Sequence, residues 1–100
     1  MSTVHLLTLI APVSLEEVLV DWLLQTSPSG GFCSGPINRH GAHHERLSLA
    51  EQVAGRERRI RFEVHADELE ITDMLAHLRQ AYAGTHLHYW TTPISEVGTL

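Results

Sequence analysis

The sequence contains no lysine and only one cysteine, Cys33. A single cysteine excludes an intramolecular disulfide and gives no sign of an oxidising compartment. Because lysine is absent, any anion site must use arginine, histidine or backbone N–H groups. The net charge of −5 also argues against a nucleic-acid binder, since such proteins normally present a basic face.

Long uninterrupted apolar runs are missing as well. Residues 6–24 are rich in leucine and valine, but Pro12, Glu16, Glu17 and Asp21 interrupt them, so we expect no membrane insertion. The N-terminus lacks the basic region and apolar stretch of a signal peptide. One hundred residues suffice for one hydrophobic core. We therefore expect a single cytoplasmic domain spanning residues 1–100.

Apolar spacing predicts a strand and then a helix near the N-terminus. Both alternating sets of residues 4–10 are apolar, which is typical of a strand buried on both faces. Ser14 and Glu17 match a capping box, so we expect a helix to begin at Ser14 and to end near residues 27–31. Its predicted buried face comprises Leu15, Val18, Leu19, Trp22 and Leu23.

A weaker strand is predicted at 32–39, and Pro36 would place it at a sheet edge or at a bulge. Residues 59–65 alternate more clearly. Their apolar side chains are expected to point inward, and the polar ones, Arg59, Arg61, Glu63 and His65, outward.

The last third of the sequence predicts a second helix and a final strand. Asp67 and Glu70 form a second capping pair, and Gly84 is expected at the C′ position that follows the helix. The buried stripe of this helix should comprise Ile71, Met74, Leu75, Leu78 and Tyr82. The strand is expected at 86–92, with one face carrying His86, His88 and Trp90.

The predicted order is β-α-β-β-α-β, which is the ferredoxin-like arrangement. We expect an α+β fold in which two helices cover one face of an antiparallel four-stranded sheet. A long mobile loop, about 40–57, would join the second and third strands. The uncovered face of the sheet would expose aromatic side chains, and oligomerisation would bury it.

The densest group of metal-ligating side chains lies in residues 40–45, with His40, His43, His44 and Glu45. Neutral imidazole is a borderline-soft ligand, and a carboxylate completes a nitrogen–oxygen set suited to zinc, copper, cobalt or nickel. Short histidine-rich tracts support metal binding. The alternative is a solvated polar loop in which the histidines coincide by chance.

A second candidate ligand site comprises Arg39, Arg56, Arg58, Gly84, His86, His88 and Trp90. The arginines could hold an anion together with backbone N–H groups near Gly84. The alternatives are a solvated or intersubunit arginine face, and structural histidines beside an interface tryptophan. No nucleophile–base pattern accompanies Cys33, so we expect no enzymatic activity.

Three segments together resemble a family of small PII-like proteins that are frequently encoded beside heavy-metal efflux pumps of the resistance-nodulation-division class. They are HGAHHERLSLAEQV at 40–53, RIRFEV at 59–64 and HYWTTP at 88–93. The resemblance implies a ferredoxin-like subunit, a homotrimer and effector sites between subunits. It also implies that the 40–57 loop contacts a target protein, such as a membrane efflux pump.

The chain departs from ATP-binding PII proteins, which hold the phosphates with a glycine- and lysine-rich turn before the last strand. The matching turn, 82–85, has one glycine and no lysine, and the 40–57 loop has no tyrosine for modification. We therefore expect a regulatory protein that senses a divalent transition metal. The alternative is a PII-like sensor of ATP, ADP or AMP in which arginine replaces the missing lysine.

Overall fold

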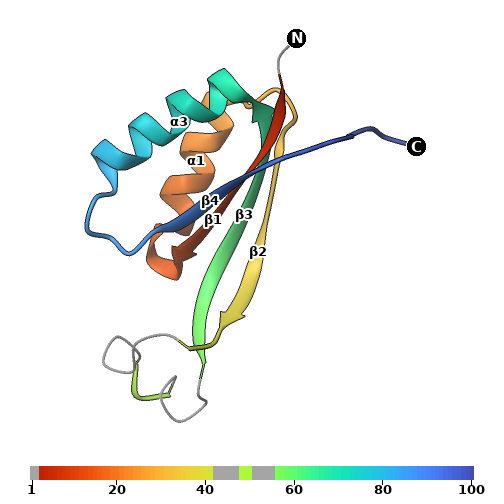
Figure 1. The fold of residues 1–100 in the computed structure, drawn as a ribbon. Coiled ribbons are helices and arrows are strands. Elements are labelled where there is room, and N and C mark those ends of the chain that lie inside the picture. The colour runs from red at the N-terminus through yellow and green to blue at the C-terminus, as the bar shows by residue number, and fades with distance from the viewer. Residues whose placement is uncertain (1–2, 42–47, 51–55) are drawn as a thin grey trace.

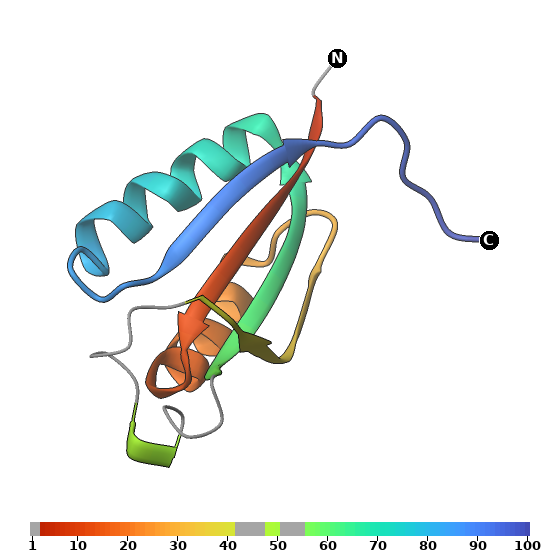
Figure 2. The same cartoon turned by 60° about the horizontal axis from the view of Figure 1, so that its bottom comes forward.

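The computed structural model describes residues 3–41, 48–50 and 56–100 of the chain. The described strands form one antiparallel sheet in the order β2-β3-β1-β4, and both helices lie on the same face of it (Figures 1 and 2). The ferredoxin-like α+β prediction is confirmed. The elements are β1 (Val4–Pro12), a 3-10 turn η1 (Val13–Leu15), α1 (Glu16–Thr26), β2 (Phe32–Arg39), β3 (Glu57–Asp67), α3 (Glu68–Ala81) and β4 (His88–Pro93).

The hydrophobic core lies between the sheet and the two helices. The central strands β1 and β3 contribute side chains that are fully inaccessible to solvent, and Leu9 pairs directly with Phe62 across them. From the helices, the buried residues are Leu19, Leu23, Ile71, Met74 and Leu78. Each large apolar side chain buried in this way contributes about 1.5–3 kcal/mol of transfer free energy.

The start of α1 differs from the sequence prediction. The chain passes from Pro12 directly into η1, so Ser14 lies inside that turn and does not cap a helix. The N-cap of α1 is Leu15, which makes no side-chain capping bond. The predicted Ser14 capping box is therefore wrong. The buried face is also narrower than predicted, because Val18 is 47% exposed.

The start of α3 confirms its predicted capping box. The Asp67 side chain accepts a hydrogen bond from the Glu70 backbone N–H, and the Glu70 carboxylate accepts one from the Asp67 N–H. At the other end, the C-cap is Tyr82. Gly84, with φ of +80°, therefore lies two residues beyond the cap, one residue later than the predicted C′ position.

The last two strands have bounds that differ from those predicted. β3 begins at Glu57, inside the segment expected to be loop, and Arg59 on this strand is buried although it was predicted to point outward. β4 begins only at His88, because His86 has a left-handed backbone with φ of +64°. His86 and His88 therefore do not share a strand face, and that prediction is wrong.

Candidate functional site

The β2–β3 ladder positions the two ends of the histidine-rich segment. Its last residue pair is Arg39 with Glu57, so His40 and Arg56 leave neighbouring strands. Paired strands lie only about 5 Å apart, which keeps the two ends of the 40–56 segment together. Figure 1 shows this end of the hairpin at the opposite end of the sheet from the N-terminus.

A buried ion pair lies at this end of β3. The side chains of Arg59 and Glu57 are 4% and 8% exposed, and they form a salt bridge with each other. Arg59 Nη1 also donates a hydrogen bond to the backbone carbonyl of His86, at 3.2 Å. A buried charge is tolerated only when it is paired and hydrogen-bonded. One guanidinium thus joins the first residue of β3 to the turn between α3 and β4.

The carboxylate of Glu57 is not fully satisfied by this arrangement. Its Oε2 atom is buried and has no hydrogen-bond partner within the described part of the chain. An unpartnered oxygen makes the pair depend still more on the Arg59 guanidinium.

Three arginines line a cavity of about 410 Å3 next to this pair. Arg56, Arg58 and Arg59 surround it together with Asn38, and its remaining lining side chains are apolar. A guanidinium presents a planar fork of donors that matches carboxylate and phosphate oxygens. The geometry therefore suits an anion. Two of the predicted anion-binding residues, Arg56 and Arg58, lie in the lining of this cavity, and Arg39 does not.

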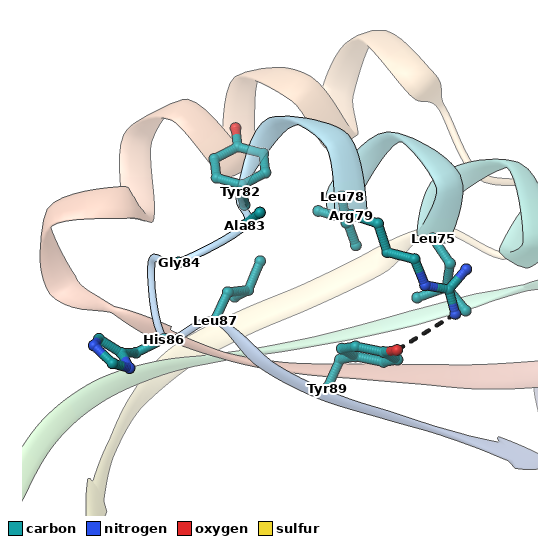
Figure 3. A pocket seen from close by; sticks show the side chains of 9 residues that line it. All are labelled: Leu75, Leu78, Arg79, Tyr82, Ala83, Gly84, His86, Leu87 and Tyr89. Atoms are coloured by element: carbon teal, nitrogen blue, oxygen red, sulfur yellow. Dashed lines mark hydrogen bonds between the residues drawn. The ribbon is translucent and has the colours of Figure 1, made fainter.

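The turn between α3 and β4 forms a separate cavity. Gly84 and His86 help to line it, and its volume is also about 410 Å3 (Figure 3). Within the turn, the Thr85 backbone N–H and hydroxyl both donate to the carbonyl of Tyr82, at 3.3 and 2.6 Å. These two donors are consequently used by the turn itself. Gly84 and the arginines were predicted to act together, but they line different cavities.

The face of the sheet without helices carries His88 and Trp90. Their rings lie 5.6 Å apart in an edge-to-face arrangement. Both residues are exposed, whereas the β1 residues registered beside them, Ile10 and Thr8, are only 5% and 3% exposed. Exposed aromatics above buried neighbours are typical of a surface that a partner covers.

Most of the predicted metal ligands lie outside the residues that the structure describes. His40 is exposed directly after β2, while His43, His44 and Glu45 lie outside the described residues. Among the described residues, no three His, Cys, Asp or Glu side chains are grouped as a metal site requires. The metal site in residues 40–45 therefore stays a prediction.

Sequence reasoning missed the Glu57–Arg59 pair. Strict alternation along β3 placed Arg59 outward with Arg61 and Glu63, and those two do form an exposed ion pair at 3.2 Å. A signal was present, because Glu57 and Arg59 have opposite charges two residues apart and therefore share one face of a strand. Their burial depends on the turn at His86, which lies 27 residues away in the sequence.

The match to known families covers the whole chain. The family model for DUF3240, described as a protein of unknown function, matches residues 1–100. The chain belongs to the DUF3240 family. The crystal structure of a DUF3240 family protein from Shewanella baltica is similar to it, with a TM-score of 0.77 and 27% sequence identity over 100% of this chain and 99% of that one.

Two more distant crystal structures share the fold of this DUF3240 chain. One is a Thermus thermophilus protein described as PII-like and assigned to signalling, with a TM-score of 0.67, 21% identity, and coverage of 93% of this chain and 88% of that one. The other is a functionally unknown protein from Pediococcus pentosaceus, with a TM-score of 0.68 and 9% identity over 100% of both chains. None of the curated proteins matches the chain.

The described helices do not meet the requirements of a bilayer. Neither α1 nor α3, nor any other helical stretch in the described ranges, has both the length and the apolar character needed to cross a membrane.

Proposed function

We propose that this DUF3240 protein is a non-catalytic, PII-like regulatory protein that forms a homotrimer and senses a divalent transition metal. The observation that carries the proposal is the buried Arg59 guanidinium, which contacts both Glu57 and the His86 carbonyl. A ligand that orders the segment between β2 and β3 would act on the same ion pair that holds the α3–β4 turn. Coupling of this kind is what a sensor needs to present a changed surface to a partner.

The metal would be held by His40, His43, His44 and Glu45. Imidazole nitrogens with one carboxylate oxygen form a donor set that zinc accepts, and the same set suits copper, cobalt or nickel. Ordering a loop costs about 1–2 kcal/mol of backbone entropy per residue. Coordination to two or three imidazoles offsets such a cost more readily than solvent-exposed hydrogen bonds do.

The homotrimer is supported by the uncovered face of the sheet. Trp90 is 45% exposed there, and burying such an aromatic side chain against another copy gains about 25 cal/mol per Å2 of apolar area removed from water. An assembly with effector sites between subunits is also what the resemblance to PII-like proteins implies, and the chain shares its fold with a protein described as PII-like. A target that suits a metal-responsive regulator is a heavy-metal efflux system, contacted through the 40–57 segment.

The second candidate function is a sensor of ATP, ADP or AMP. The cavity lined by Arg56, Arg58 and Arg59 favours it, because guanidinium groups in the lining could replace the lysine of a phosphate-binding turn. One of the three, Arg59, is already paired with Glu57. Against it, the Thr85 N–H and hydroxyl are already engaged with the Tyr82 carbonyl.

Titration calorimetry separates the two candidates. The protein is titrated with zinc, copper and cobalt salts and, in parallel, with ATP, ADP and AMP. Heat from a metal that is lost in the His43→Ala/His44→Ala variant supports the metal sensor. Heat from a nucleotide that is lost in the Arg56→Ala/Arg58→Ala variant supports the nucleotide sensor. The absence of heat with both the metals and the nucleotides would refute both candidates.

A further inference from the structure

The cavity between α3 and β4 is lined mainly by apolar and aromatic side chains, together with Arg79 and His86. Leu75, Leu78 and Leu87 border it, with Arg79 and Tyr89 at one end (Figure 3). Among the residues that the structure describes, no aspartate or glutamate lies in its lining. A cavity with this composition fits a short aliphatic segment that also carries a negative charge.

Arg79 is held over this cavity by weak contacts only. Its Nη2 lies 3.4 Å from the Tyr89 hydroxyl, and its guanidinium carbon lies 5.9 Å from the centre of the Tyr89 ring. Within the described ranges of the chain, no carboxylate forms an ion pair with Arg79. The guanidinium is therefore able to pair with a carboxylate that arrives from elsewhere.

Residues 94–100 have the complementary composition. Ile94 donates its N–H to the Val4 carbonyl at 3.0 Å, and beyond this bond the chain continues past the end of β4 (Figures 1 and 2). Leu100 is exposed there, and Val97 is 53% exposed at the edge of a cavity that Val4 and His65 also line. Glu96 is the only ionisable side chain in the segment. Aliphatic side chains on an exposed, irregular segment gain stability only when another surface covers them.

The segment is directed away from the cavity of its own subunit. The cavity lies at the His88 end of β4, whereas residues 94–100 follow Pro93 at the other end. The six residues of β4 span about 20 Å at 3.3 Å per residue. Residues 94–100 would have to reverse direction to return over that length, while in an assembly they can reach another copy without any reversal.

We propose that residues 94–100 of one copy dock in the α3–β4 cavity of a second copy. Val97 and Leu100 cover the leucines of the cavity, and Glu96 pairs with Arg79. This inference rests on the assembly stated in the proposed function and adds to it the segment that joins one copy to the next. The apolar contacts supply the affinity, and the ion pair selects this segment over other apolar ones.

Disulfide trapping tests the contact. Ala83 borders the cavity and Thr99 lies in the segment, and both are exposed. Two proteins are prepared in a Cys33→Ser background, one with Ala83→Cys and the other with Thr99→Cys, and are mixed and oxidised. We expect the mixed disulfide to exceed either homodisulfide. The matched control replaces Ala83→Cys by Leu69→Cys, because Leu69 is exposed near the start of α3, whereas Ala83 follows its end. It should give no excess of mixed disulfide.

A charge exchange tests the ion pair independently. Arg79→Glu alone and Glu96→Arg alone should each lower the yield of mixed disulfide severalfold, and the two together should restore it. Light scattering on the same samples distinguishes the failures. A monomer at micromolar concentration would overturn both the assembly and the docking. An oligomer without the mixed disulfide, or with the Leu69 control trapped equally well, would overturn the docking alone.

Discussion

The two faces of the sheet differ in how completely the rest of the chain buries their side chains. On the helix-covered face, Leu9, Phe62 and Val64 are fully buried by α1 and α3. On the other face, Trp90 and His88 remain exposed over buried β1 residues, and a charged pair, Arg61–Glu63, lies 39–52% exposed. The covered face thus holds most of the buried apolar side chains of the subunit. The open face and the end of the β2–β3 hairpin are where we propose that partners and ligands bind.

Phe62→Ala should produce the largest effect on the covered face. The side chain is fully buried, so its removal costs transfer free energy and leaves a cavity, together about 3–5 kcal/mol. Urea unfolding followed by circular dichroism measures the loss. A change of less than about 1 kcal/mol would show that the helical layer does not supply the stability assigned to it.

Arg59→Met should cost nearly as much, although it lies at the hairpin end and not in the core. The variant leaves the Glu57 carboxylate buried without a cation, which typically costs about 3–5 kcal/mol. The double variant Glu57→Leu/Arg59→Met should recover most of this loss, because no uncompensated charge remains. Equal destabilisation of the single and double variants would contradict a role based on charge pairing.

Trp90→Ala should show most clearly that the open face contributes to assembly and the covered face to the stability of the subunit. Trp90 is 45% exposed in one subunit, so its loss should weaken assembly much more than it weakens the subunit. We expect the association constant to fall by about tenfold or more, which corresponds to about 1.4 kcal/mol. Sedimentation velocity over a range of concentrations measures it. Unchanged assembly would place the interface elsewhere.

Asp67→Ala should produce the smallest effect. It removes the side chain that accepts a hydrogen bond from the Glu70 N–H at the start of α3, and such caps contribute about 1 kcal/mol. The variant should lower the midpoint of urea unfolding and leave assembly unchanged. Asp67→Asn, which keeps the acceptor, serves as the control and should retain most of the stability.

The differences between prediction and structure follow the same division between the faces. Periodicity correctly placed Phe62, Val64, Met74 and Leu78 in the core, because these positions depend on local spacing alone. Arg59 was misplaced because its burial depends on a carbonyl contributed by a turn distant in sequence. Spacing can reveal which residues of a strand share a face, but it cannot reveal what a distant turn brings to that face.

The helix boundaries show a similar limit. The Asp67 capping box was recognised correctly, whereas the Ser14 box failed because the chain leaves β1 through a 3-10 turn. Both sequences match the same pattern, and the strand geometry before the helix decides which one caps. For the candidate site, the histidines of residues 40–45 were identified by composition alone, and that assignment stays a prediction.

The central claim of the proposed function is that a metal bound by the 40–45 histidines stabilises the α3–β4 turn through the contacts of Arg59. Hydrogen–deuterium exchange with and without zinc, at about pH 7.5, tests it most directly. We predict slower exchange in residues 40–57 and also in residues 82–87. The effect should vanish in the His43→Ala/His44→Ala variant. It should also weaken as the pH is lowered, because a protonated imidazole cannot bind a metal. Exchange that zinc leaves unchanged in the parent protein would contradict the claim.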